Sequence, residues 1–145
     1  MDFLRRLFIV LTQVHPTHPM IVHFPIALTG AAFLFILLAY WKKSASLEGA
    51  AFANITLAAV STVVAGATGM MDNIKNYSGK APNASVKVVL ALILFLLTTS
   101  ISIVRYHNPE LFQRGNRFLY AGAYGLSFAI ALVLAFLGGV ILYGF

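Results

Sequence analysis

Four long apolar stretches dominate the pattern of hydrophobic and polar positions along the chain. They cover approximately residues 20–41, 49–71, 86–104 and 118–143. A transmembrane helix needs about 20 predominantly apolar residues, so each stretch is long enough to cross a bilayer. The pattern predicts an all-α fold: residues 15–145 form an integral membrane four-helix bundle of up-down-up-down topology, embedded in the lipid bilayer.

Residues 1–14 are too short to cross a bilayer, but their pattern is that of an amphipathic helix. On a helical wheel, Arg5 and Arg6 lie opposite an apolar face. That face consists of Phe3, Leu4, Leu7, Phe8, Leu11 and Val14. We expect a short interfacial helix that lies along the membrane surface. An irregular N-terminal extension is the alternative.

The predicted topology gives the bundle two ends. Side A holds the start of the first span, the link at 73–84 and both termini, whereas side B holds the links at 42–48 and 105–117. Tyr40, Trp41 and Lys42 form an aromatic and basic border that is typical of the headgroup level. Lys and Arg divide five to five between the two sides, so the positive-inside rule gives no orientation.

Composition supports a membrane protein and excludes several other classes. Hydrophobic residues make up 60% of the chain, well above the soluble range of about 45–50%. The net charge of +6 is carried by residues between the apolar stretches, where they anchor the chain to lipid headgroups, and we expect no nucleic-acid partner. The absence of cysteine excludes disulfides, iron–sulfur clusters and covalent haem attachment. The sequence shows no nucleophile triad or phosphate-binding glycine loop, which disfavours an enzyme.

The segment 15–28, HPTHPMIVHFPIAL, holds three of the four histidines and three of the five prolines. His23 lies inside an apolar stretch, where an ionisable side chain is by default a functional hypothesis. Pro25 lacks an N–H, so we expect a kink or a loosened turn beside His23. Ala27 and Gly30 follow His23 on the same helical face, and their small size leaves room for a flat cofactor or for a closely packed helix.

His18 and His23 are the candidate cofactor or metal ligands. Five residues apart, they are separated by about 140° around a helix, so they do not share a face if both are helical. A bis-histidine haem then needs residues 16–19 to fold back over His23, or a second protomer. Met70 is a further candidate ligand through its thioether, although methionine in a membrane helix more often fills apolar space.

Asp72 belongs to the same expected layer on side A. A carboxylate beside an imidazole favours an ion pair or a proton relay, which suggests His23 and Asp72 as relay residues. A water-facing carboxylate at a helix end is the alternative. In the second span, Asn54, Ser61 and Thr62 are expected to form hydrogen bonds between helices.

Three strings are similar to those of a large bacterial family of four-span membrane proteins, domain of unknown function 2231. They are HPMIVHFPIAL at 18–28, the GxxD pattern at 69–72, and LGGVILYGF at 137–145. The resemblance implies the bacterial inner membrane and redox surroundings, because that domain also occurs joined to Rieske-type or cytochrome-type modules. It points to His18, His23 and Asp72. Many relatives also have a histidine early in the third span, where this chain has Ser85, Val86 and Lys87.

Three functions follow as expectations. The first is a small membrane subunit associated with electron transfer, holding b-type haem or a quinone near the histidine segment. The second is a non-catalytic structural subunit that packs on other subunits of a larger respiratory or photosynthetic membrane complex. The third is a carrier of protons, metal ions or small solutes.

Overall fold

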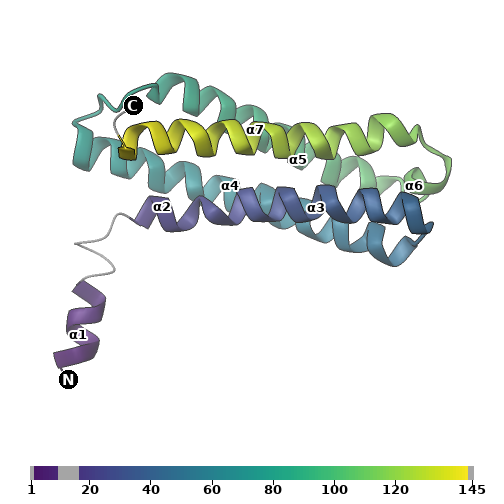
Figure 1. The fold of residues 1–145 in the computed structure, drawn as a ribbon, viewed down its shortest axis with the longest axis horizontal. Helices are drawn as coiled ribbons and strands as arrows, with labels where there is room; N and C mark the ends of the chain where they lie inside the picture. The colour runs from purple at the N-terminus through teal and green to yellow at the C-terminus, as the bar shows by residue number, and fades with distance from the viewer. Residues whose placement is uncertain (1, 10–16, 144–145) are drawn as a thin grey trace.

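The computed structural model of the protein describes the backbone of residues 2–9 and 17–143, and the side chains of 3–6 and 17–140. Helices are the only regular secondary structure among these residues. The helices are α1 (Asp2–Ile9), α2 (Thr17–Ile21), α3 (His23–Lys42), α4 (Ala45–Tyr77), α5 (Ala84–His107), α6 (Leu111–Arg114) and α7 (Arg117–Tyr143). Four segments are long and apolar enough to cross a membrane: α2 with α3, α4, α5, and α7. Figure 1 shows these four lying side by side along one axis.

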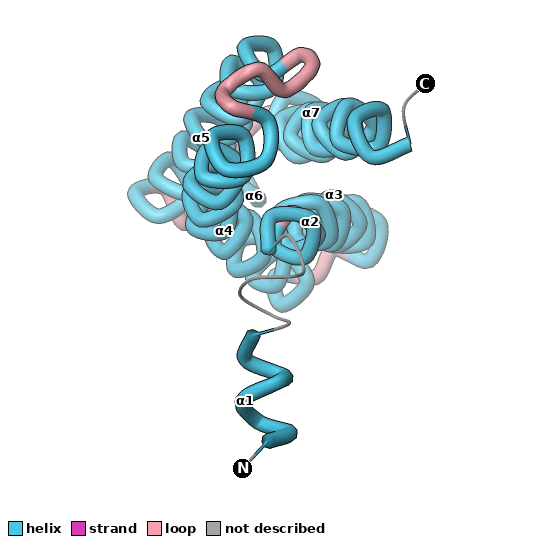
Figure 2. The backbone as a smooth tube through the Cα atoms, turned by 90° about the vertical axis from the view of Figure 1, so that its left-hand side faces the viewer, coloured by secondary structure: helices cyan, strands magenta, loops and turns pink. Residues whose placement is uncertain are grey.

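The four long helices close into a ring. Helix α3 packs against α4 and α7, and α5 packs against the same two helices, as the view along the axis shows (Figure 2). The core between them contains Ala32, Ile36, Ala51, Ile55, Ile101, Tyr120 and Tyr124. Large apolar side chains such as Leu34, Val60 and Phe136 point outward, as expected for a surface that faces lipid. The predicted all-α membrane bundle is confirmed, while the orientation of the spans and the side of both termini stay predictions.

The N-terminal segment is helical, as expected, over Asp2–Ile9. Phe3, Leu4, Arg5 and Arg6 are all exposed. The remainder of the expected helix, residues 10–14, lies outside the described residues. That the helix lies along the membrane surface stays a prediction.

Helix α4 begins before the expected span at 49–71 and continues beyond it. Its first turn includes Glu48, and the Ser44 side chain caps it by accepting a hydrogen bond from the Leu47 amide at 3.4 Å. The helix ends only at Tyr77, so Asp72 lies inside it rather than at its end. Hydropathy marks the part of a helix that fits the hydrocarbon layer, whereas the polar residues at 72–76 extend the same helix past that layer.

The first span is interrupted directly before His23, as the sequence predicts. Helix α2 ends at Ile21 and α3 begins at His23, with Val22 between them. Pro25 has no N–H to donate, and the next amide, that of Ile26, reaches the Val22 carbonyl only at 3.5 Å. This loosened turn allows His18 and His23 to take different surroundings.

Candidate functional site

The imidazole of His18 is turned toward α4. Its Nδ1 lies 3.2 Å from the Thr68 hydroxyl oxygen, and this hydroxyl also donates to the Val64 carbonyl at 3.0 Å. His18 Nδ1 is therefore the donor to Thr68. The ring lies against Gly69, where a Cβ atom would come within 2.8 Å of His18 Cε1. Gly69 thus provides the space in which the half-buried imidazole packs.

The imidazole of His23 is exposed on the outside of the bundle. Its Nδ1 lies 2.5 Å from the Pro19 carbonyl oxygen, four residues earlier. Because a carbonyl oxygen only accepts, the Nδ1 atom carries the proton, and in the neutral imidazole Nε2 keeps its lone pair. Among the described residues, that Nε2 has no hydrogen-bond partner. His23 therefore offers a free electron-pair donor on an outward face.

The two small residues that follow His23 differ in their surroundings. Ala27 is exposed, so the surface next to the imidazole is open there. Gly30 does not leave room for a cofactor, because a Cβ atom on it would lie 3.0 Å from the ring of Phe128. Gly30 serves the close packing of α3 against α7, which is the second of the two roles that the sequence suggests for it.

His18 and His23 do not come together as a pair of ligands. One faces α4 and the other faces outward. Within the part of the chain that the structure describes, no group of three or more His, Cys, Asp or Glu residues is arranged to hold a metal ion. Met70 is 62% exposed on α4. The expected shared metal site of His18, His23 and Met70 is therefore not assembled by these described residues, and His15 lies outside them.

Asp72 is close to His18 rather than bonded to His23. Its carboxylate accepts a hydrogen bond from Asn76, one turn later in α4. Asp72 and Lys87 both lie within electrostatic range of the His18 imidazole. No hydrogen bond or ion pair recorded for the described residues joins Asp72 to His23, so the suggested relay between these two is not supported.

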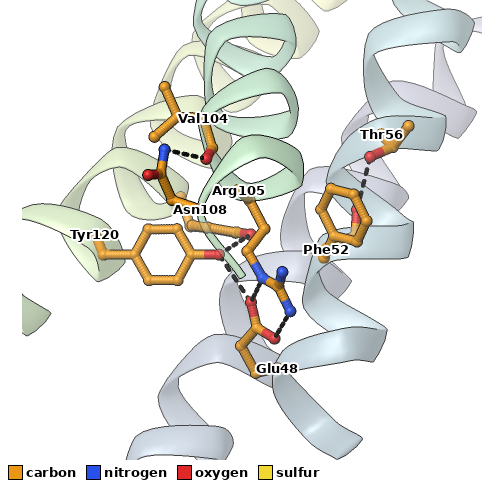
Figure 3. A network of polar contacts seen from close by, with 8 residues as sticks. Glu48, Phe52, Thr56, Val104, Arg105, Asn108 and Tyr120 are labelled. Carbon is orange, nitrogen blue, oxygen red and sulfur yellow. Dashed lines mark hydrogen bonds and ion pairs between the residues drawn. The ribbon is translucent and has the colours of Figure 1, made fainter. Parts of the chain in front are cut away.

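A second polar cluster, at the opposite end of the bundle, joins three helices (Figure 3). Glu48 of α4 is only 2% exposed, and Arg105 of α5 binds both of its carboxylate oxygens, at 2.5 and 2.8 Å. The Tyr120 hydroxyl of α7 donates to Glu48 Oε1 at 2.9 Å and lies 3.1 Å from the Tyr124 hydroxyl. We call Glu48, Arg105, Tyr120 and Tyr124 the glutamate clamp.

The sequence pattern does not show the glutamate clamp, because its members lie in different parts of the chain. Glu48 and Arg105 fall in the links at 42–48 and 105–117, and Tyr120 lies near the start of the apolar stretch at 118–143. The signal was nevertheless present, since the predicted topology brings all three to side B. A bidentate carboxylate–guanidinium pair with a further hydroxyl donor leaves no buried charge unpaired, which makes the clamp a structural element.

Asn54, Ser61 and Thr62 do not bond between helices, contrary to expectation. They donate to carbonyl oxygens of their own helix, Asn54 to Ala50 at 2.8 Å and the other two to Ala58 at 3.0 and 2.7 Å. A short polar side chain in a helix reaches the carbonyl three or four residues earlier more easily than a neighbouring helix. A direct bond between hydroxyls of two helices joins Thr56 and Ser102, at 3.1 Å.

The comparisons with known proteins agree with the membrane fold. A family model described as "Predicted membrane protein (DUF2231)" matches residues 14–145. Neither the curated proteins nor the solved structures gave a match.

Proposed function

Because that match covers nearly the whole length, the chain belongs to the DUF2231 family of predicted membrane proteins, and we propose that it is a small subunit of a membrane electron-transfer system. In this proposal His23 would bind the iron of a b-type haem through its Nε2 atom. The observation that carries the proposal is the hydrogen bond from His23 Nδ1 to the Pro19 carbonyl on an exposed face. Histidines that ligate metals commonly donate their other ring N–H to a carbonyl or carboxylate in this way.

The donor chemistry fits a single haem ligand better than a quinone site. A neutral His23 with its proton on Nδ1 has only a lone pair left at Nε2, which a haem iron accepts. A quinone carbonyl needs a hydrogen-bond donor instead, and Nε2 is not one in this tautomer. When bound, the haem supplies one-electron transfer, while the chain supplies its ligand and its orientation.

The haem of this proposal lies between two chains. His23 and Ala27 are exposed, and the space beside Gly30 is filled by Phe128, so the described part of a single chain does not enclose a flat ring there. His18 faces α4 and is held by Thr68, which leaves it turned away from His23. In this proposal a neighbouring chain would supply the second ligand of the haem and would cover its outer face.

A reduced-minus-oxidised visible spectrum of the protein purified in mild detergent tests this function. We expect haem bands in the wild type and in His107→Ala, which removes an exposed histidine at the far end of α5. We expect no haem bands in His23→Ala. A well-folded wild type without haem bands, from cells that make haem, would overturn the proposal, as would unchanged bands in His23→Ala.

The second candidate function is a structural subunit, and a groove on the outer face of α4 and α5 favours it. The groove has a volume of about 320 Å³ and is lined by Thr62, Val63, Gly66, Val88, Ala91, Leu92 and Phe95. A Cβ atom on Gly66 would meet nothing within 4 Å. Small residues on an exposed membrane helix allow another helix to approach closely.

Filling the groove tests the structural role. Gly66→Ile adds a branched side chain there without touching the bundle, so it should abolish association with another helix and leave the fold intact. Gly122→Ile on α7 is the matched control, because a Cβ atom at that position also meets nothing within 4 Å. Fluorescence energy transfer between donor-labelled and acceptor-labelled copies of the chain in vesicles measures their association. Equal association of wild type and Gly66→Ile would remove the groove as a docking site for a second copy of the chain.

A further inference from the structure

We propose that the bundle binds the phosphate group of an anionic phospholipid in a cleft at the end that holds the glutamate clamp. The cleft is lined by Tyr40, Lys43, Ala45, Phe112, Gln113 and Arg117. We call it the side B cleft. This inference is independent of the electron-transfer role, because it uses none of the histidines.

The side B cleft is formed where four helices meet, which gives it a defined shape. It lies between the end of α3, the start of α4, the short helix α6 and the start of α7, and its volume is about 260 Å³. The rings of Tyr40 and Phe112 pack with their centroids 4.8 Å apart and form an apolar wall. Arg117 extends over this wall, with its Cζ atom 5.7 Å from the centroid of the Tyr40 ring.

The charge of the side B cleft is positive and uncompensated. Among the described residues, two carboxylates lie at this end of the bundle, and both are already paired: Glu48 with Arg105, and Glu110 with Arg114 at 2.6 Å. None of the residues that line the cleft is acidic. Lys43 and Arg117 therefore have no ion-pair partner among the residues that the structure describes. The start of α4 at Ala45 adds the positive end of a helix dipole.

Lys43 occupies a backbone conformation in which glycine is favoured. It terminates α3 with φ 50° and ψ 42°, the left-handed region that side chains with a Cβ disfavour. A glycine at this position would cap α3 with less strain. The chain instead keeps a cation at the edge of the cleft, and a role of its charge in binding accounts for this.

The position along the bundle axis identifies the source of the phosphate. Tyr40 and Trp41 form the aromatic border of the first span, and Trp41 is 78% exposed. Such borders lie at the level of lipid headgroups, where the phosphates of the bilayer are. Basic pockets between transmembrane helices bind anionic headgroups at this level. A free phosphate ion has the same chemistry, so the experiment must separate the two sources.

The single tryptophan of the chain makes the proposal measurable, because Trp41 directly precedes Lys42 and Lys43. Brominated lipid next to Trp41 quenches its fluorescence. Vesicles that mix brominated phosphatidylglycerol with phosphatidylcholine, and the reverse mixture, give the relative binding of the two lipids. A basic residue near anionic headgroups contributes a preference of roughly fivefold. We expect the wild type to prefer phosphatidylglycerol by at least about this factor.

Two variants remove the preference in different ways. Lys43→Gly removes the cation and relieves the left-handed strain, so it should be at least as stable as the wild type and yet lose most of the preference. Arg117→Gln should lose it as well. Arg114→Gln, an exposed cation at the same end but outside the cleft, should retain it.

Three results would overturn the proposal. The first is equal binding of both lipids by the wild type. The second is an equal loss of preference in Arg114→Gln and Arg117→Gln, which would indicate surface charge alone. The third is loss of the wild-type preference when millimolar inorganic phosphate is added to the vesicles, while chloride at the same ionic strength leaves it unchanged. That result would indicate a site for the free phosphate ion.

Discussion

At the residue scale, the surroundings of His18 and His23 decide what each imidazole can do. The break at Val22 separates the two residues into different helices, so their faces need not follow one helical wheel. Gly69 and Thr68 of α4 hold His18 inward, whereas the Pro19 carbonyl holds His23 outward. The sequence predicted the break, because Pro25 removes a donor. It did not predict which histidine faces inward, because that depends on a glycine of a different span.

The contact between His18 and Gly69 gives a prediction about stability. Gly69→Ala should lower the free energy of unfolding by about 1–3 kcal/mol, the range for overpacking, because the new Cβ atom would force His18 away from Thr68. Gly66→Ala, one turn earlier, is the matched control. Its Cβ atom meets nothing, so it should gain up to about 1 kcal/mol from helix propensity. Reversible unfolding in mixed micelles measures both. A Gly69→Ala protein as stable as Gly66→Ala would contradict the packing role.

At the element scale, hydropathy located the spans but not the polar turns that extend them. The apolar stretch at 49–71 became a helix from Ala45 to Tyr77, and the added first turn carries Glu48 into the bundle. The stretch at 86–104 corresponds to α5, Ala84–His107, and the stretch at 118–143 to α7, Arg117–Tyr143. A charged residue one turn outside an apolar stretch is exposed in some proteins and buried in others, depending on its partners. Glu48 is buried because Arg105 and Tyr120 bind its carboxylate.

The glutamate clamp gives the largest stability effect that we predict. Glu48→Ala leaves Arg105 without its carboxylate and removes the acceptor of the Tyr120 hydroxyl, so we expect a loss of about 3–5 kcal/mol in the free energy of unfolding. Glu110→Ala is the matched control. Its ion pair with Arg114 is exposed and lies within one turn, so the loss should stay below about 0.5 kcal/mol.

A double-mutant cycle separates the pair from the individual residues. Arg105→Met should lower the free energy of unfolding much less in the Glu48→Ala background than in the wild type. The carboxylate that the substitution would leave unpaired is already gone in that background. Additive losses in the two variants would show that Glu48 and Arg105 do not depend on each other, contrary to the clamp.

At the scale of the whole molecule, the bundle has two chemically different ends. One end has the imidazole of His18, within electrostatic range of Asp72 and Lys87, and the other has the glutamate clamp and the side B cleft. The topology expected from four apolar stretches predicts which residues share an end, as it did for His18 and Asp72. It does not predict which of them touch, because rotation of each helix about its axis is set by packing. Phe128 against Gly30 is one such contact.

The outer surface of the bundle also bears on its function. Apolar side chains cover the four spans, and the exposed imidazole of His23 interrupts them near one end. A polar side chain directed away from the bundle needs water, a headgroup or a partner. The partner that our proposal assigns to His23 is a haem, which a neighbouring chain would help to hold.

A haem titration of protein purified in mild detergent tests the central claim most directly. Haem is added in steps to wild-type protein that has been freed of its own haem and to His23→Ala, and the shift of the main haem absorption band is followed against the ratio of haem to chain. If His23 binds the haem, the shift saturates at a fixed ratio in the wild type and is absent in His23→Ala. A shift that rises without saturation, or equal titrations of the two proteins, would contradict haem binding by His23.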